Sequence, residues 1–368
     1  MIHQGVLSFS APPCPHVAET ISQRAFYSTP YGGAYCADSL EVLRSLPDGS
    51  VNLVVTSPPY ALHFKKEYGN ASQAEYVDWL LPFAHEIRRV LTADGSFVLN
   101  VGGSWQPGVP TRSIYTYKLL VALVETVGLH LAQEFFWYNP AKMPVPAEWV
   151  TVRRIRVKDS VEFVWWLSKT EWPKASNREV LRPYSPDMIR LAAKGLRSTK
   201  RPAGHIIKDS FANTDSGGSI PPNVLDEDVP SDLMKFGNNA ANDVYTLRCK
   251  EAGIKIHPAR FPAVMPEFFI KFLTHVGDVV LDPFAGSNTT GMVAEALERR
   301  WVAIDLDRDY LEASKFRFES VIEPESFAGD ARPKRGSKAS TQSPKARPAQ
   351  GKNSSAARKS KTRKARSA

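Results

Sequence analysis

Apolar residues along this chain follow two patterns, a repeat of three to four residues and short unbroken runs. The repeat is typical of amphipathic helices, and the runs are typical of buried strands. The predicted helices contain the stretches "SLEVLRSL", "EYVDWLLPFAHEIRRVL", "YKLLVALVETVG", "PEFFIKFLT", "TTGMVAEALE" and "YLEASKFRFESVI". The predicted strands contain "GGAYC", "VNLVV", "GSFVLNV", "AQEFFWY", "VVLD" and "WVAIDLD". Helices that alternate with buried strands predict an α/β fold built on a doubly wound sheet.

This alternation breaks between residues 141 and 250. Residues 148–208 contain fourteen Lys and Arg against six Asp and Glu, and the stretch "DSGGSIPPNVLDED" that follows is loop-like. We therefore expect one α/β domain split by a basic insertion of about a hundred residues, an ordinary size for a subdomain. The expected parts are an irregular N-terminal arm at 1–30, the two halves of the α/β domain at 31–146 and 251–325, the insertion at 147–250 and a tail at 326–368.

The net charge of +9 is concentrated in the tail. From Asp330 onward the chain has thirteen Lys and Arg and one Asp, so the tail carries +12 and the rest of the chain carries −3. The tail has no aliphatic periodicity, which predicts that it is disordered. Its charge favours weak, sequence-independent attraction to nucleic-acid phosphates.

Composition also bounds the class of protein. No apolar run in the 368 residues is long enough to span a bilayer, and the N-terminus lacks the basic start and apolar core of a secretory signal. We expect a cytoplasmic protein of bacterial type. The cysteines are Cys14, Cys36 and Cys249, an odd number without a C-x-x-C pair. Neither a disulfide framework nor a metal site is expected.

Two loops carry the candidate chemistry, and the first lies in "VVLDPFAGSNTTGMVAEALE". A strand ends at Asp282 and a helix follows, and ligands of open α/β sheets bind at this edge. Gly286 permits a close approach between the backbone and a ligand. Asn288 tolerates a positive φ, and Thr289 or Thr290 is placed to cap the helix.

The next predicted strand ends at Asp305, where a carboxylate can bind ribose hydroxyls. The loop before it has neither G-x-G-x-x-G nor the Lys of a P-loop, which argues against dinucleotides and ATP hydrolysis. A cofactor with adenine and ribose but no phosphate fits this pattern better.

The second loop is "TSPPY", which follows the predicted strand 51–55. Pro58 and Pro59 have no N–H, so their carbonyls remain available as acceptors, and their fixed φ makes the loop stiff. Ser57 adds another acceptor and Tyr60 a flat aromatic face. Together they suit a planar group that carries an NH₂, such as a nucleobase flipped out of the helix.

A D-P-F-A-G-S-N-T-T loop combined with an S-P-P-Y loop resembles the DNA amino-methyltransferases that use S-adenosylmethionine. The S-P-P-Y motif comes first and the basic segment lies between the two motifs, an order similar to the family's β group. The resemblance extends from roughly residue 33 to residue 318. It implies a Rossmann-like methyltransferase fold, circularly permuted, with an inserted target-recognition region that binds double-stranded DNA, and it places the protein at the bacterial nucleoid.

The resemblance also implies roles for individual residues. The catalytic motif is matched by Ser57, Pro58, Pro59 and Tyr60. The cofactor-binding positions are matched by Asp38, His257, Phe261, Pro262, Asp282, Pro283, Phe284, Gly286, Asn288, Thr289, Thr290 and Asp305. The residues expected to contact DNA are Arg153, Arg154, Arg156 and Lys158, since Arg reads guanine and both residue types hold phosphates.

Neighbouring positions support three further expectations. If residues 153–158 form a strand, alternate side chains face away from DNA. Trp165 and Trp166 are expected in the core because their neighbours are apolar. Asn100 ends a predicted strand and is expected near Ser57, and its amide cannot act as a base.

Ser rather than Asp at the start of the S-P-P-Y motif is similar to the branch that methylates cytosine at N4, and the resemblance in the recognition region implies a target related to CAGCTG. Adenine-N6 methylation by the same fold is the first alternative. A protein-glutamine methyltransferase is a distant one, because those enzymes have the two motifs in the opposite order. A DNA-binding protein without activity is the third. The role is either protection from a restriction endonuclease that cuts the same site or orphan marking of DNA.

Overall fold

The computed structural model describes residues 17, 20–61, 71–140, 142–195, 199–200, 206–207, 216–225, 244–260 and 262–319. These residues belong to one compact unit, Met1–Phe327. The predicted tail and Phe261 lie outside the described residues. No helix in the described part of the chain combines the length and the apolar character needed to cross a bilayer.

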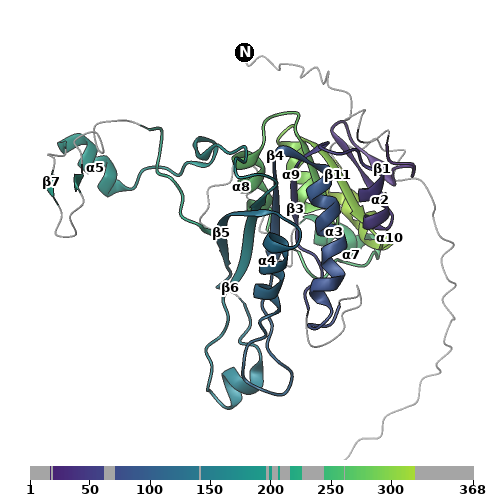
Figure 1. Ribbon diagram of the computed structural model, residues 1–368, viewed down its shortest axis with the longest axis horizontal. Helices are drawn as coiled ribbons and strands as arrows, with labels where there is room; N and C mark the ends of the chain where they lie inside the picture. Colours follow the sequence, from purple (N-terminus) through teal and green to yellow (C-terminus); the bar gives the residue numbers. More distant parts are fainter. Residues whose placement is uncertain are drawn as a thin grey trace, which may run out of the picture. The chain divides into compact units, whose positions relative to one another are not determined.

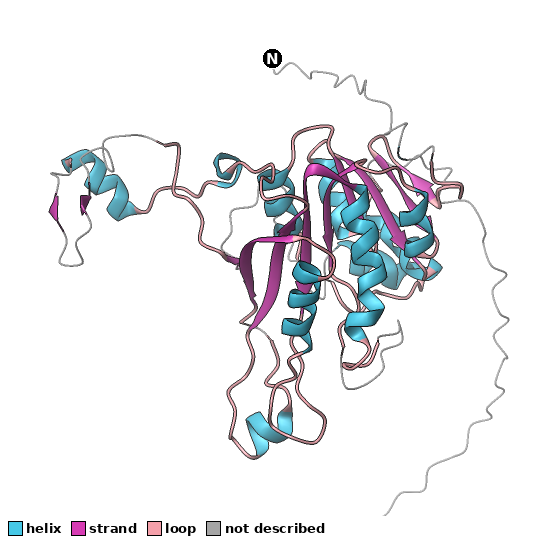
Figure 2. Ribbon diagram, viewed as in Figure 1, coloured by secondary structure: helices cyan, strands magenta, loops and turns pink. Residues whose placement is uncertain are grey.

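A nine-stranded mixed sheet forms the centre of the fold, in the order β1-β2-β11-β10-β3-β4-β6-β5-β9 (Figure 2). Strands β2, β11, β10, β3 and β4 are parallel to one another, whereas β1 is antiparallel to β2, and β6 is antiparallel to β4 and β5. The strand bounds are β1 Tyr27–Ser28, β2 Gly32–Cys36, β3 Val51–Thr56, β4 Leu91–Val101, β5 His130–Tyr138, β6 Val161–Ser168, β9 Val224–Leu225, β10 Val279–Asp282 and β11 Arg300–Asp305. A separate hairpin pairs β7 Thr199–Lys200 with β8 Ile206–Ile207.

Helices cover both faces of this sheet (Figure 1). The described α-helices are α2 Ser39–Ser45, α3 Tyr76–Val90, α4 Tyr115–Glu125, α5 Pro186–Lys194, α7 Val244–Ala252, α8 Val264–Leu273, α9 Thr289–Ala296 and α10 Arg308–Ser314. Short turns of other helix types are η1 Glu148–Val152, η2 Asn177–Val180 and η3 Lys315–Arg317. The helices predicted from the apolar repeat are therefore confirmed, with bounds that differ by a few residues, except the last. There the α-helix ends at Ser314, a 3₁₀ turn follows, and residues 320–322 lie outside the described part of the chain.

Two hydrophobic clusters lie on opposite faces of the sheet. The first packs α2, α3 and α4 against the sheet, and the second packs α8 and α9 against the other face. In β3, Val54 belongs to the first cluster and Leu53 and Val55 to the second, because successive strand residues point to opposite faces. Trp165 and Trp166 divide between the clusters in the same way, and both are buried. The prediction that these two tryptophans are core residues is confirmed.

Part of the predicted insertion at 147–250 belongs to the central sheet. Residues 161–168 form β6, which lies between β4 and β5. The basic composition of the segment hides this strand, but its apolar residues pair with β4 by an antiparallel ladder. Tyr27 and Ser28 also differ from the prediction, because they leave the irregular arm and pair with β2.

Candidate active site

The two predicted loops meet at one edge of the sheet. β3 and β10 are parallel neighbours, so the residues after Thr56 and after Asp282 leave the sheet side by side. The Oγ1 of Thr56 donates a hydrogen bond of 2.6 Å to Oδ1 of Asp282, across 226 residues of sequence. This bond joins the strand end that precedes "SPPY" to the strand end that precedes "PFAGSN".

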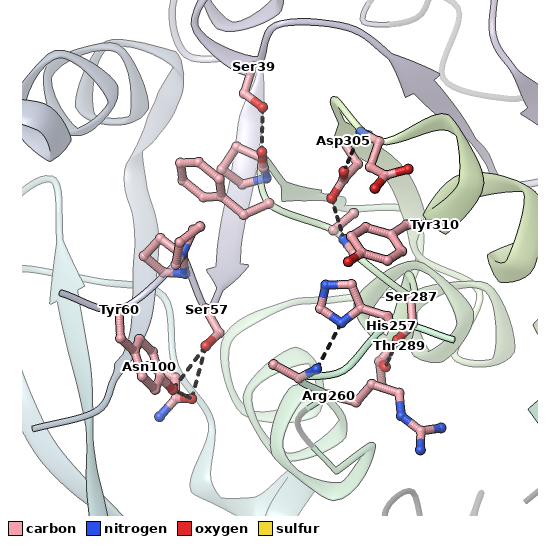
Figure 3. A pocket seen from close by; sticks show the side chains of 18 of the residues that line it. Ser39, Ser57, Tyr60, Asn100, His257, Arg260, Ser287, Thr289, Asp305 and Tyr310 are labelled. Atoms are coloured by element: carbon pink, nitrogen blue, oxygen red, sulfur yellow. Dashed lines mark hydrogen bonds between the residues drawn. The ribbon is translucent and has the colours of Figure 1, made fainter. Parts of the chain in front are cut away.

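A cavity of about 790 Å³ opens between these loops. Ser57, Tyr60 and Asn100 lie on one side of it, and His257, Asp305 and Tyr310 lie on the other (Figure 3). The predicted site residues that line it are Asp38, Ser57, Pro58, Pro59, Tyr60, His257, Pro283, Phe284, Gly286, Thr289 and Asp305. Most of the predicted catalytic and cofactor-binding residues therefore face one space.

Gly286 lies in the left-handed region of backbone conformation. Its φ is +51°, and a Cβ on it would lie 2.8 Å from Nε2 of His257. Its N–H donates to Oδ2 of Asp305 at 2.8 Å. The absence of a side chain thus lets the loop, His257 and the end of β11 approach one another.

Asn288, rather than Thr289 or Thr290, caps α9, so the predicted capping residue is wrong. Asn288 has a φ of 52°, and its side chain accepts a hydrogen bond from the N–H of Gly291. Its Nδ2 also donates to the hydroxyl of Tyr27 at 2.9 Å. The amide of Asn288 reaches the helix from this left-handed conformation, which Asn tolerates better than Thr does.

The two threonines bond elsewhere in the loop. Thr290 Oγ1 donates to Oδ2 of Asp282 at 2.7 Å, while the Thr289 hydroxyl lies 3.3 Å from that of Ser287. Three predicted cofactor residues, Asp282, Asn288 and Thr290, are buried behind the cavity wall. They hold the loop in shape from behind, and Pro262 is likewise not among the lining residues.

The carboxyl group of Asp282 is enclosed by donors. Besides Thr56 and Thr290, the N–H of Phe284 donates to it at 3.1 Å. Burial raises the pKa of Asp282 from 3.8 to about 6, although these hydrogen bonds act in the opposite direction. Asp282 therefore organises both loops at the cost of a buried charge at neutral pH.

Two more carboxylates lie at the cavity, Asp38 and Asp305. Asp305 accepts the N–H groups of Gly286 and Asp307, and burial raises its pKa. Asp38 is exposed and caps α2, where its Oδ1 accepts the N–H groups of Leu40 and Glu41. Each carboxylate is thus oriented by backbone donors.

His257 contributes a neutral ring to the same side of the cavity. Burial is the largest cause that lowers the pKa of His257, from 6.5 to about 4. Its Nδ1 accepts the N–H of Ala259 at 3.3 Å, and its ring meets that of Tyr310 edge to face at 4.4 Å. A neutral imidazole adds no positive charge to this part of the site.

The S-P-P-Y motif is held by a hydrogen-bonded group at the ends of β3 and β4. The Ser57 hydroxyl lies 3.1 Å from that of Tyr60 and donates to Oδ1 of Asn100 at 3.2 Å. The expected proximity of Asn100 and Ser57 is confirmed. Tyr60 packs against Gly102, where a Cβ would lie 2.4 Å from the ring. Gly102 is a site residue that the sequence patterns do not reveal.

Glu162 is a second residue that sequence reasoning missed. It lines the cavity from β6, and its Oε2 accepts the Tyr60 hydroxyl at 2.9 Å. Its Oε1 accepts a hydrogen bond of 2.8 Å from Nζ of Lys142. Burial, and then the charge of Glu162, raise the pKa of Tyr60 well above its ordinary value. The detectable signal was a single acidic residue inside the apolar strand "VEFVWWLS".

An aromatic wall completes the cavity. Trp79 and Phe83, one turn apart on α3, lie with ring centroids 5.7 Å and 5.1 Å from that of Phe284. All three line the cavity, as does Trp137 of β5. The helical spacing of Trp79 and Phe83 was visible in the sequence, but it equally fits a core helix.

The predicted DNA-binding residues lie away from the cavity lining. They follow η1 in irregular backbone, so the strand expected at 153–158 is wrong. Arg153 bonds Glu148 at 2.7 Å and stacks on Trp149, and Arg156 lies 3.7 Å from Asp159. Lys158 donates to the carbonyl of Pro140 at 2.7 Å.

Arg154 differs from the other three. It is exposed, and its φ is 54°. Local bonds thus occupy Arg153, Arg156 and Lys158, whereas the side chain of Arg154 points into solvent.

Comparison with known proteins relates this geometry to a family. A family model described as DNA methylase matches residues 51–316. Type II methyltransferase M.PvuII of Proteus hauseri is 51% identical over 295 residues, which are 79% of this chain and 85% of that protein. Type II methyltransferase M.ScaI of Streptomyces caespitosus is 29% identical over 300 residues, 81% of this chain and 84% of that protein.

A solved structure gives the same relationship. The PvuII DNA methyltransferase (cytosine-N4-specific) superposes with a TM-score of 0.64 at 44% identity, covering 81% of this chain and 90% of that one. The predicted α/β methyltransferase fold is confirmed by this match. The matches cover most of the chain, and they agree with two loops that open onto one cavity at adjacent strand ends. This protein therefore belongs to the N6 and N4 methyltransferase family of DNA methylases.

Proposed function

We propose that the protein transfers a methyl group from S-adenosylmethionine to N4 of a cytosine that is flipped out of double-stranded DNA. The observation that carries this proposal is the shared cavity, onto which both the Ser57–Tyr60 loop and the Gly286 loop open. One loop offers hydrogen-bond acceptors for an amine, and the other offers a backbone cradle for a second molecule. A transferase needs both substrates in one place.

The residues present fit S-adenosylmethionine, which when bound supplies an electrophilic methyl group on a positively charged sulfur. Gly286 and Asp305 both line the cavity, and we assign Asp305 to the ribose hydroxyls. The aromatic wall of Trp79, Phe83 and Phe284 offers faces for a purine. The low pKa of His257 avoids repulsion of a cationic ligand.

Ser57 and the carbonyl of Pro58 would accept hydrogen bonds from the amine of the base. Such acceptors orient the lone pair of N4 and stabilise the positive charge that develops on it. Neither Pro58 nor Pro59 has an N–H to oppose that charge. Tyr60 offers its ring as a stacking face. The choice of cytosine is supported by the solved relative, which is named cytosine-N4-specific.

Double-stranded DNA in the cytoplasm, at the bacterial nucleoid, is the proposed substrate, and CAGCTG the proposed target. This target is carried over from the resemblance in the recognition region. The residues proposed to contact the DNA are Arg153, Arg154, Arg156 and Lys158. The first, third and fourth would have to give up the local contacts with Glu148, Asp159 and Pro140 to do so. The proposed biological partner is a restriction endonuclease that cuts the same site. Plasmid DNA treated with the protein should then resist an endonuclease that is blocked by methylation of CAGCTG.

Mass spectrometry of nucleosides tests the base. DNA is incubated with the protein and S-adenosylmethionine that carries a deuterated methyl group, and then digested to nucleosides. Labelled N4-methylcytosine is the expected product. Labelled N6-methyladenine would keep the fold and donor but overturn the base. An unlabelled DNA pool, with binding of the donor shown by calorimetry, would overturn the proposed substrate.

A further inference from the structure

Glu162 occupies an unusual place for an acidic residue. It lies on β6, one of the central strands, with its side chain only 13% exposed. Strand register brings it to the site. Asn100 of β4 pairs with Val164 of β6. Glu162 precedes Val164 by two residues, so its side chain lies on the same face of the sheet as those of Val164 and Asn100. Its two oxygens contact Tyr60 and Lys142. A carboxylate thus lies directly behind the S-P-P-Y motif.

The hydrogen bonds among Ser57, Tyr60 and Glu162 form a continuous chain. Ser57 Oγ is 3.1 Å from the Tyr60 hydroxyl, which is 2.9 Å from Oε2 of Glu162. The Tyr60 hydroxyl also lies 2.8 Å from Oδ1 of Asn100. It has one proton for two acceptors, and a charged acceptor makes the stronger bond.

Asn100 cannot end this chain. Its Nδ2 donates to the carbonyl of Phe163 at 3.1 Å, which fixes the orientation of the amide. An amide oxygen accepts hydrogen bonds but does not take up a proton at neutral pH. Of the groups that contact the Tyr60 hydroxyl, Glu162 alone carries a carboxylate.

We infer that Glu162 accepts the proton that the target amine loses, through Ser57 and Tyr60. The inference rests on the proposed function. When the lone pair of N4 forms the new N–C bond, sulfur keeps the electron pair of the broken C–S bond. N4 is then cationic and must lose one proton.

Each proton in this relay moves over one hydrogen bond. The Ser57 hydroxyl first turns its proton from Oδ1 of Asn100 toward the oxygen of Tyr60, 3.1 Å away. Ser57 Oγ then takes the proton from N4 while its own proton passes to Tyr60. The Tyr60 proton passes to the carboxylate of Glu162. Both hydroxyls are restored, N4 is neutral, and Glu162 becomes a neutral acid that later returns the proton to water. Lys142 holds the carboxylate in line throughout.

Single-turnover methylation of an oligonucleotide by Glu162→Gln, Tyr60→Phe and the double variant tests the relay. Gln preserves the shape of the side chain but loses its charge and basicity, and Phe keeps the stacking face of Tyr60. Each single variant should lose about 10²-fold or more in rate, the usual scale of general acid–base catalysis. The double variant should be no slower than the slower single variant, because either change alone interrupts the same relay.

Further measurements separate a relay from a structural role. The affinities for S-adenosylmethionine, by calorimetry, and for DNA with 2-aminopurine at the target position should remain within about threefold in every variant. Glu134→Gln is the matched control, because Glu134 is exposed on the neighbouring strand β5. It should keep the wild-type rate.

Several outcomes would overturn the inference. Glu162→Gln or Tyr60→Phe at the wild-type rate would exclude the relay, and Tyr60→Phe decides the matter if the Gln variant fails to fold. A double variant whose loss is the product of the two single losses would show that Glu162 acts independently of Tyr60. Lost donor affinity in Glu162→Gln would assign it a structural role. Wild-type protein that methylates no DNA base would instead overturn the proposed function, and the relay with it.

Discussion

Gly286 shows how a single residue shapes the cavity. Its positive φ and the short distance from its Cβ position to His257 are separate constraints on a side chain. Gly49 has the first constraint without the second, since its φ is +64° but no atom lies within 4 Å of its Cβ position. Comparison of Gly286 with Gly49 therefore separates the effect of the positive φ from the effect of the contact with His257.

We predict that Gly286→Ala lowers the affinity for S-adenosylmethionine at least about tenfold, or about 1.4 kcal/mol. Gly49→Ala should leave the affinity unchanged. Both variants should lose about 1–2 kcal/mol of stability from the left-handed backbone. Isothermal titration calorimetry and urea denaturation provide the two readouts. Equal affinities in the two variants would contradict the close approach at Gly286.

Asp282 gives a prediction for pH. Its pKa is raised from 3.8 to about 6, so the folded state holds the proton more tightly than the unfolded state does. This group therefore stabilises the fold at low pH, and that contribution is lost as pH rises from about 4 to about 6. The carboxylate that joins the two loops is a cost to stability at neutral pH.

Asp282→Asn mimics the protonated acid and should be insensitive to this titration. The free energy of unfolding of the wild type, relative to the variant, should fall by about 2 kcal/mol between pH 4 and pH 7. Urea denaturation at several pH values measures the difference, and titrations common to both proteins cancel. A difference that grows with pH would contradict the raised pKa.

At the scale of residues, the sequence reveals positions whose chemistry is local. The positive φ of Asn288 and the acceptors of the S-P-P-Y motif follow from residue type and order. Glu162 could not be found this way, because its contact with Tyr60 depends on the register of β4 and β6, strands far apart in the chain. A side chain that bonds across strands is set by pairing, which short-range patterns do not encode.

At the scale of elements, α9 begins where the Gly286 loop ends, and Asn288 connects the two. The Asn288 amide caps the helix and also bonds the Tyr27 hydroxyl. Because Asn288 is buried, a lost hydrogen bond there leaves unsatisfied groups in the core. The start of the helix, the loop and β1 are therefore coupled.

Two substitutions separate the cap from the backbone conformation. Asn288→Gly removes both side-chain bonds but tolerates the positive φ, so we predict a loss of about 1–2 kcal/mol. Asn288→Ala should lose about 1 kcal/mol more, because Ala is strained in that conformation. Urea denaturation of the three proteins gives the order. Ala and Gly variants of equal stability would show that the backbone relaxes.

The elements themselves illustrate what sequence patterns resolve. Helices such as α3 and α4 were evident because their apolar residues repeat over several turns. β6 was assigned to the insertion because the basic residues before it dominate the local composition, although its own residues are apolar. Composition over a long window conceals a strand of eight residues, and the sheet order reveals it.

At the scale of the whole molecule, charge is divided between residues 1–329 and the tail. The tail from Asp330 carries a net charge of +12, whereas the rest of the chain carries −3, so the whole chain has a net charge of +9. A basic segment of this kind adds counterion release to DNA binding without reading bases. Sequence preference should then depend on the folded part alone.

Deletion of residues 326–368 should lower the slope of the logarithm of DNA affinity against the logarithm of salt concentration, by about 0.9 for each phosphate contact that is lost. The methylated sequence should not change. Fluorescence anisotropy at several salt concentrations measures the slope, and sequencing of methylated DNA measures the preference. An altered target sequence after deletion would contradict this division of roles.

The position of β10 between β3 and β11 has a consequence for synthesis on the ribosome. When β9 has been made, β3 still lacks the neighbour that only residues 279–282 provide. A nascent chain therefore carries an open strand edge, which is prone to aggregation, until most of its length has been translated. Premature termination before residue 279 should therefore yield an aggregation-prone chain, because β3 keeps its open edge.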